Sequence, residues 1–508
     1  MQIVWFKRDL RVQDHEPLHR AAQCGPVLPL YIVEPELWQQ PDMSGRHWAF
    51  VRESLIALRE DLTRLGQTLV VRHGEAADVL KTLCMQHRVA AVWSHQETGN
   101  AWTYRRDRAV RELLSRSGIP WHQPRQHGVV RGPLDRDGWS RQWEALMGVS
   151  RFAPPGLPPI GGVDPGALPT QPTSALTDDP CPGRQPGGRQ AAEQALHSFL
   201  EQRGERYHLE MSSPRTAPSS CSRLSAHMAW GTLSIREALQ ATRHKRARIK
   251  QKPPAQRGTW GRALAAFEGR LHWHCHFMQK LESEPRFEFE NMQRATSGLR
   301  DPHCDAVRLL AWQSGTTGWP MVDACMRSLA HTGWINFRMR AMLMSVSSYQ
   351  LWLHWREPAL HLARQFVDYE PGIHYPQAQM QSGTTGINTL RIYNPVKQSL
   401  DQDPDGVFIR TWVPELTCVD ERWIHTPWQM PPSVQRDCGV LIGRDYPAPL
   451  VDHEAAARQA RQKIVEARRT ADARSESRSI HARHGSRKRT QQRRKRGPHQ
   501  ASLFPDGA

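Results

Sequence analysis

Short apolar runs alternate with helical patterns along the first part of the chain. The apolar runs read IVWF, VLPLYIV, TLVVRH, VAAVWS and IPWH, and the longest helical pattern between them covers Arg46 to Leu65. Strands that are apolar on both faces and alternate with helices are typical of a parallel sheet with helices on both sides. The pattern therefore predicts a doubly wound α/β domain over residues 1–125.

The composition changes after this domain. Residues 154–190 contain ten prolines and seven glycines, which predicts a long connector over residues 126–190 instead of core elements. From residue 191 to 450 nearly every segment has the apolar spacing of a helix, so we predict an all-α domain there. Residues 451–508 are predicted to form a disordered basic tail. The expected fold class is thus α/β followed by all-α.

The positive charge is concentrated at the end of the chain. The net charge is +18, and residues 456–508 carry 15 lysines and arginines against 4 acidic residues, so this segment supplies +11. Such a tail either binds a polyanion or is a solvated extension, and charge alone leaves both open. No apolar run has the length of a membrane span, and the start lacks a signal peptide pattern, so we expect a cytoplasmic protein with no membrane contact.

Two segments carry candidate chemistry. Residues 219–239 place Ser222, Arg223 and Ser225 directly before a helical pattern, which is either a cradle for a phosphate or an ordinary helix cap. Residues 314–329 read SGTTGWPMVDACMRSL and predict a helix that starts at Pro320, with Thr316 or Thr317 as its N-cap.

Charged residues interrupt the apolar faces of two predicted helices. Asp323 and Arg327 lie in the helix that begins at Pro320, and Arg338 and Arg340 lie in the apolar segment that follows it. A buried arginine needs an anionic neighbour or an anionic ligand. Asp368, in FVDYEPGIHY, is a candidate partner, and an ordinary surface ion pair remains the alternative.

Taken together, these segments resemble the photolyase/cryptochrome family of flavoproteins. TGWPMVDACMRSL resembles the family's signature segment, CSRLSAHMAWGTLS its flavin-phosphate segment, and VWFKRDLRVQDHEPL its opening strand and loop. RIYNPVKQSLDQDPDGVFIRTWVPEL resembles the end of its flavin domain. The resemblance covers roughly residues 1 to 430, in the family's order.

The resemblance implies a folded FAD in the helical domain, with the polar residues of the signature helix serving its pocket. An antenna chromophore, folate or deazaflavin, is implied for the α/β domain without its identity. Arg340 and Asp368 would pair beside the flavin ring. The implied cofactor-binding residues are Tyr207, Cys221, Ser222, Arg223, Leu224, Ser225, Arg340, Asp368 and Glu370; the implied catalytic residues are Trp273, His374 and Trp355; the implied DNA-binding residues are Trp273, Arg338 and Gln398.

Several positions depart from the family pattern. Arg270 stands where repairing members have a glutamate, Phe337 where they have an asparagine, and His374 where an asparagine usually faces the flavin's reactive nitrogen. Of three tryptophans that reduce the flavin in the family, only Trp355 matches by position. The other two positions are Pro302 and Ala378, so an electron would have to use other aromatic residues, such as Trp312, Trp334 or Trp352.

Three functions follow from these observations. The first is light-driven repair of pyrimidine dimers in DNA; the second is a cryptochrome-like light sensor; the third is a basic nucleic-acid binder without flavin. We expect a monomer. The last residues, QASLFPDGA, resemble the peptide that docks on the bacterial polymerase sliding clamp, through Gln500, Leu503 and Phe504, although a chance match is the alternative.

Overall fold

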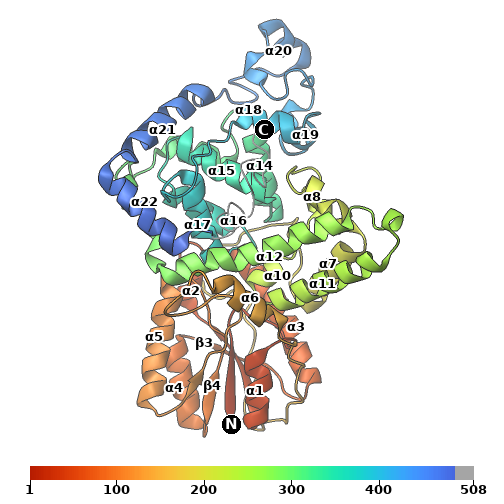
Figure 1. Cartoon of the computed structure of the whole chain (residues 1–508), viewed down its shortest axis with the longest axis vertical. Coiled ribbons are helices and arrows are strands. Elements are labelled where there is room, and N and C mark those ends of the chain that lie inside the picture. Colours follow the sequence, from red (N-terminus) through yellow and green to blue (C-terminus); the bar gives the residue numbers. More distant parts are fainter. Residues whose placement is uncertain (487–508) are drawn as a thin grey trace.

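The computed structural model describes residues 1–486 and shows an α/β domain below a larger helical domain (Figure 1). Each of the five apolar runs forms a strand, and the strands make one parallel sheet in the order β3-β2-β1-β4-β5. The strands are β1 (Gln2–Phe6), β2 (Val27–Val33), β3 (Val70–His73), β4 (Ala91–Trp93) and β5 (Trp121–His122). The predicted fold class is confirmed.

Alternate residues of β1 serve two different cores. Ile3 and Trp5 pack with α4 (Ala76–Gln86) and α5 (Ala101–Arg116), whereas Val4 and Phe6 pack with α1 (Glu16–Cys24) and α3 (Gly45–Arg64). A short helix, α2 (Pro35–Trp38), follows β2. The core on the side of Val4 continues without a break into the helical domain, so the two domains share buried apolar surface.

The connector of residues 126–190 is not wholly irregular. It contains α6 (Trp139–Gly148), whose Trp139 and Trp143 are buried in a core of the helical domain. The remainder runs along the α/β domain, where the N–H of Leu157 donates to the carbonyl of Leu65 at 2.7 Å. The Pro/Gly content of the flanking segments hid this short amphipathic helix from the sequence analysis.

The second domain is helical, as predicted, and α12 crosses it directly above the α/β domain (Figure 1). Its helices are α7 (Arg189–Glu201), α8 (Tyr207–Glu210), α9 (Ala217–Ser220), α10 (Ser225–Ala229), α11 (Ile235–Gln251), α12 (Trp260–Ser283), α13 (Ala306–Ser314), α14 (Pro320–Thr332), α15 (Phe337–Tyr349), α16 (Arg356–Gln365), α17 (Pro371–Ser382), α18 (Pro395–Gln402), α19 (Val407–Trp412) and α20 (Pro432–Cys438).

The start of α14 differs from the sequence prediction. The helix begins at Pro320, but its N-cap position is Trp319, so neither Thr316 nor Thr317 caps it. Asp323 instead reaches back from inside the helix and accepts hydrogen bonds from the N–H groups of Thr317 and Gly318, at 2.8 and 3.1 Å. Asp323 thus ties the loop of residues 317–318 to the helix, and among residues 1–486 no side chain caps the first N–H groups of α14.

The two charged residues of α14 hold neighbouring segments together. Asp323 also accepts a hydrogen bond from the hydroxyl of Tyr446 at 2.5 Å. Arg327 donates to the carbonyl of Gly315 at 3.0 Å and pairs with Glu415 at 2.8 Å. Protein groups thus satisfy both side chains, and the role of these residues in the flavin pocket, implied by the resemblance, stays a prediction.

The predicted disorder of residues 451–508 is also wrong for its first part. This part forms α21 (His453–Ala467) and α22 (Ala471–His484), which lie against the helical domain (Figure 1). Ala460, Ile464 and Ile480 are buried there. These few apolar positions at helical spacing outweigh the surrounding charge. Residues 487–508, which include the predicted clamp peptide, lie outside the described residues.

Two further features concern the described part as a whole. Across residues 1–486, no helix combines the length and the apolar character that crossing a bilayer requires. All nine cysteines are free, and within this part none belongs to a group of side chains close enough to hold a metal ion.

Candidate functional site

The segment predicted to bind phosphate is a loop between α9 and α10. Arg203 holds this loop, since its guanidinium donates to the carbonyls of Cys221 and Ser222. Arg223 has a φ of +61°, a left-handed conformation that is rare for a residue with a side chain. Leu224 is fully buried and anchors the loop in the core. The hydrogen bonds from Arg203 and the burial of Leu224 thus hold the loop in one conformation.

Positive charge accumulates around Cys221. Burial raises the pKa of its thiol to about 12, and four arginines oppose that rise: Arg223, Arg203, Arg270 and Arg340. Burial also lowers the pKa of Arg223 to about 10, and its guanidinium stacks on Trp334 at 4.1 Å. An excess of half-buried guanidinium groups is a suitable environment for the phosphates of a ligand. Sequence analysis missed Arg203, which no motif marks.

Arg340 and Asp368 form the pair that the resemblance implies. Nη1 of Arg340 donates to Oδ1 of Asp368 at 2.9 Å, and Nη2 donates to Oδ2 at 2.8 Å. Although burial disfavours the charged carboxylate, Arg340 and a hydrogen bond from Ser225 hold the pKa of Asp368 below its ordinary value. The pair therefore ties α15 to the start of α10 and to the segment before α17.

Two positions that depart from the family pattern lie against each other. The guanidinium of Arg270 on α12 faces the ring of Phe337 at 5.8 Å and is hydrogen-bonded to Tyr207. Burial raises the pKa of Tyr207 to about 12. Trp273, one turn further along α12, is half-buried and stacks on Phe277 at 5.6 Å. The result is an aromatic and basic surface.

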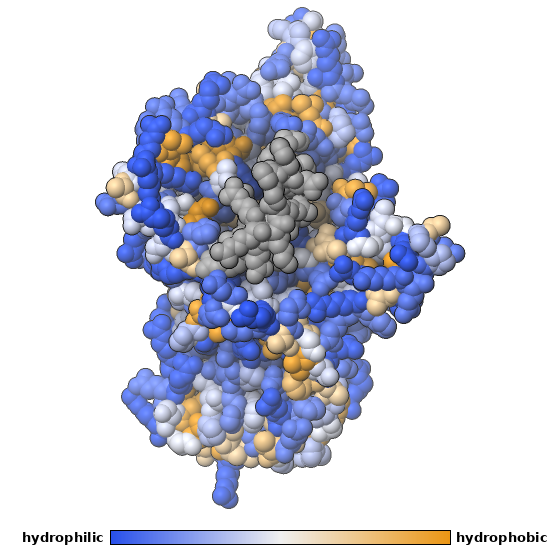
Figure 2. All heavy atoms as spheres, viewed as in Figure 1, coloured by the Kyte–Doolittle hydropathy of each residue, from blue (hydrophilic) through white to orange (hydrophobic). Residues whose placement is uncertain are grey.

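Phe337 is 47% exposed, which is unusual for a large apolar side chain. Figure 2 shows hydrophobic patches on one face of the helical domain, in otherwise hydrophilic surroundings. Close by in the sequence, Nη1 of Arg338 donates to Oε1 of Gln398 at 3.4 Å. Because Gln398 is only 4% exposed, it orients Arg338 and offers little surface of its own to a ligand.

His374 lies in α17, where its ring is neutral. Nε2 donates to the carbonyl of Ala359 at 2.7 Å, and burial lowers the pKa of His374 to about 4. Nδ1 is therefore an acceptor without a proton, whereas an asparagine would also offer a donor. Glu370 precedes the same helix, and burial raises its pKa to about 7.

Trp355 is completely buried, and its Nε1 donates to Oδ1 of Asn291 at 2.7 Å. The centroid of its ring lies 6.5 Å from that of Tyr375. The hydroxyls of Tyr375 and Tyr369 both donate to Oδ2 of Asp42, at 3.1 and 2.5 Å. Sequence analysis missed this cluster, since Asp42 comes from the other domain.

The alternative tryptophans have separate surroundings. Trp312 is buried and donates to the carbonyl of Leu343 at 3.2 Å, while Trp334 lies under Arg223. Trp352 lies between the side chains of Arg300 and Lys463, at 4.6 and 4.7 Å. Their surroundings do not single out one of the three as an electron donor.

One buried cluster in the α/β domain has the spacing of a metal site. Oδ2 of Asp9 lies 2.9 Å from Nε2 of His15 and 2.7 Å from Nδ1 of His95. Both histidine nitrogens donate to this carboxylate, and burial lowers the pKa of His95 to about 3. The facing atoms are therefore already used in hydrogen bonds, and we assign the cluster a structural role.

The two-domain fold and this basic, aromatic surface are those expected of a flavoprotein. Residues 2–134 match a family model described as DNA photolyase, and residues 267–466 match one described as the FAD binding domain of DNA photolyase. The chain is 31% identical over 475 residues to a deoxyribodipyrimidine photo-lyase of Streptomyces griseus, covering 90% of this chain and 97% of that protein. It therefore belongs to the photolyase/cryptochrome family.

Two further relatives show which kinds of family member the chain is similar to. It is 29% identical to a cryptochrome DASH of Gloeobacter violaceus, over 90% of this chain and 95% of that protein. It superposes on a class III photolyase from Agrobacterium tumefaciens with a TM-score of 0.80 and 25% identity, covering 92% of this chain and 98% of that one. Relatives of both kinds thus share its architecture along nearly the whole length.

The residues present fit FAD. The four arginines around Cys221 suit its pyrophosphate, and the Oδ1 atom of Asn336 is buried without a protein partner near the start of α15. The helical domain is an FAD-binding domain.

Proposed function

We propose that this protein is an FAD-dependent enzyme that repairs pyrimidine dimers in DNA with the energy of blue light. The observation that carries the proposal is the group of four arginines around the 221–225 loop, tied to Asp368 through Arg340. Bound FAD, when reduced and excited, supplies an electron that can split a dimer. The Streptomyces griseus relative, which is called a deoxyribodipyrimidine photo-lyase, supports this activity.

In this proposal the chain binds and orients the cofactor. Arg203 fixes the loop through its carbonyls, Arg223 binds the pyrophosphate, and Tyr207 packs beside the adenosine. Arg340, oriented by Asp368, faces the ring and lowers the cost of negative charge on it. His374 presents Nδ1 as a hydrogen-bond acceptor. The proposed cofactor-binding set also includes Cys221, Ser222, Leu224, Ser225 and Glu370.

The proposed DNA contacts come from side chains of α12 and α15 that are at least partly exposed. Trp273 and Phe337 offer aromatic surface on which an unstacked base can lie. Arg338, oriented by Gln398, contacts the DNA backbone. Arg270 replaces an acceptor with a donor, which favours contacts to carbonyl oxygens of the base over contacts to its N–H groups.

A cryptochrome-like photoreceptor is the second candidate. Arg270 and Phe337 favour it, because repairing members carry a glutamate and an asparagine at these positions. An absorption spectrum of the purified protein, followed by exposure of a thymine-dimer oligonucleotide to blue light, distinguishes the candidates. Flavin with repair supports the enzyme; flavin without repair supports the receptor; absence of flavin contradicts both.

We also propose that the protein is a cytoplasmic monomer and that its last residues dock on a bacterial sliding clamp. Leu503 and Phe504 would fill an apolar groove while Gln500 fixes the register. A peptide of residues 495–508 should bind the clamp with an affinity on the order of micromolar. A peptide with Leu503→Ala and Phe504→Ala is the control, and equal binding by both peptides would refute the docking.

A further inference from the structure

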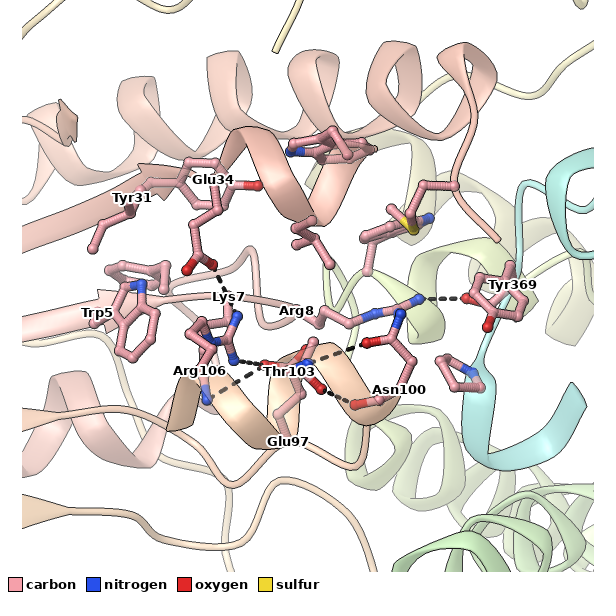
Figure 3. Close-up of a pocket in the computed structure, with 17 residues that line it drawn as sticks. Trp5, Lys7, Arg8, Tyr31, Glu34, Glu97, Asn100, Thr103, Arg106 and Tyr369 are labelled. Carbon is pink, nitrogen blue, oxygen red and sulfur yellow. Dashed lines mark hydrogen bonds and ion pairs between the residues drawn. The ribbon is translucent and has the colours of Figure 1, made fainter. Parts of the chain in front are cut away.

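The α/β domain has a crevice where its fold would ordinarily hold a ligand. In the order β3-β2-β1-β4-β5 the chain reverses direction across the sheet between β1 and β4, and ligands of open parallel sheets bind outside the carboxyl ends of the strands at such a point. Here the crevice is lined by Lys7 after β1, Glu34 after β2 and Glu97 after β4 (Figure 3). This is the place to look for an antenna chromophore.

Charged side chains fill this crevice. Arg106 on α5 donates to Glu34 at 2.9 Å and to Glu97 at 2.6 Å (Figure 3). It also donates to Asp107 at 2.7 Å. Lys7 lies 3.4 Å from Glu97 and from Asp107. All five residues are buried, so the three carboxylates and two cations pair with one another away from water, with one carboxylate in excess. Burial raises the pKa of that excess group, Glu34, to about 7.

Aromatic rings close the remaining sides. The guanidinium of Arg106 lies 4.9 Å from the ring of Trp5, and Trp38 is fully buried beside the crevice. Arg8 stacks on Trp230 of the helical domain at 4.2 Å and donates to the carbonyls of Ala229 and Tyr369. The contents of the crevice therefore also join the two domains.

Very little space is left. The cavity has a volume of about 30 Å³, and two of its polar atoms, Oε1 of Glu34 and Nε1 of Trp38, have no protein partner. A space of this size holds one or two waters, which would satisfy both atoms. Pockets for multi-ring ligands measure roughly 300–1,000 Å³. A chromophore could enter only by separating the buried charges of Arg106 from their partners, which is unfavourable.

We infer that this crevice is closed to any multi-ring chromophore and holds only water, so that the α/β domain supports the helical domain instead of collecting light through this site. The expected folate or deazaflavin does not fit here. The inference does not depend on whether the flavin drives repair or signalling.

The test uses the full, flavin-loaded chain. It is titrated with an 8-hydroxy-5-deazaflavin and with methenyltetrahydrofolate while the fluorescence anisotropy of each chromophore is followed. The same titration is made with Arg106→Lys and with the control Arg108→Lys, an exposed arginine of the same helix. No saturable binding, or binding with equal affinity in all three proteins, agrees with a closed crevice.

Binding to the parent that changes by about tenfold in Arg106→Lys but not in Arg108→Lys would place the chromophore in the crevice and overturn the inference. If Arg106→Lys does not fold, hydrogen exchange of the parent protein, with and without chromophore, shows whether the crevice is occupied. A chromophore that slows exchange of the amides of residues 97–107 lies in the crevice, whereas unchanged exchange there supports closure. Neither readout depends on repair activity, so failure of the proposed function would leave this test intact.

Discussion

Arg340 and Asp368 are joined by two parallel hydrogen bonds of 2.9 and 2.8 Å, between side chains that are 23% and 3% exposed. Such a fork fixes both the position and the direction of the guanidinium. The carboxylate has little access to water, so it depends on Arg340 for its charge. The position of the guanidinium that we propose beside the flavin ring is therefore set by this ion pair.

Charge reversal at Arg340 should release the cofactor. Arg340→Glu would leave Asp368 buried beside a like charge, a loss of about 3–5 kcal/mol. We expect FAD content after purification to fall to a small fraction of that of the parent. Arg338→Glu, on the same helix but outside the pair, is the control. Full FAD content in Arg340→Glu, with an unchanged melting temperature, would show that the pair does not support the flavin.

Acid should destabilise the fold partly through His374. Burial lowers the pKa of His374 from 6.5 to about 4, so above pH 6.5 its ring is neutral in both folded and unfolded chains. Between pH 6.5 and 4 only the unfolded chain binds the proton, and stability is lost as the pH falls. The loss from this residue is on the order of 3 kcal/mol.

This pH dependence of stability can be tested with melting temperatures from pH 7.5 to 4. They are measured for the parent and for His374→Asn. The variant should lose less stability across that window than the parent, whatever its stability at pH 7.5. His303→Asn, at an exposed position, is the control and should follow the parent. Parallel curves for the parent and His374→Asn would mean that this ring is not held neutral by burial.

Photoreduction should depend on Trp355 and Tyr375 together. The rings lie 6.5 Å apart, and the Tyr375 hydroxyl donates to Asp42, so an electron that passes from Tyr375 to oxidised Trp355 can be accompanied by a proton passing to Asp42. Trp355→Phe and Tyr375→Phe should each slow flavin photoreduction with a thiol donor by about tenfold. Trp423→Phe, at a half-buried tryptophan in a turn near the end of the helical domain, is the control. A Trp355→Phe variant that is as fast as the parent would remove this residue from the path.

Recognition of damaged DNA should depend on exposed aromatic surface. Phe337→Ala and Trp273→Ala should each weaken binding of dimer-containing DNA by roughly 1–3 kcal/mol, the usual contribution of a stacked base. Phe289→Ala is a matched control, since Phe289 is 49% exposed and Phe337 is 47% exposed. Fluorescence anisotropy of a labelled duplex measures the affinities. Equal losses in Phe337→Ala and Phe289→Ala would indicate a general effect without stacking.

The sequence predicted features that depend on short-range patterns. The five strands follow from apolar runs bounded by turns, and the helix at Pro320 follows from apolar spacing. Its cap did not follow, because Asp323 folds back on the preceding loop through tertiary packing with Tyr446. Likewise α21 was missed, since two buried positions, Ala460 and Ile464, decide its packing against a strongly charged background.

Contacts between residues far apart in the chain could not be predicted from the sequence. The partnership of Asp42 with Tyr375 joins residues 333 positions apart, and no periodicity marks either residue. Arg203 could be assigned to the phosphate loop only after the chain had brought it to the carbonyls of residues 221 and 222. Arg340 and Asp368 were named as possible partners because a buried arginine needs an anionic neighbour, and the family resemblance implied the same pair.

The most direct test of the account is a repair assay with the flavin-loaded protein. A duplex with a single thymine dimer is incubated with the protein and reductant, under blue light or in the dark, and restoration of the two thymines is quantified by chromatography. We predict repair that requires light and disappears in Arg340→Glu. An intact dimer after illumination, in a protein whose flavin is fully reduced by the same light, would contradict repair and leave the photoreceptor as the function.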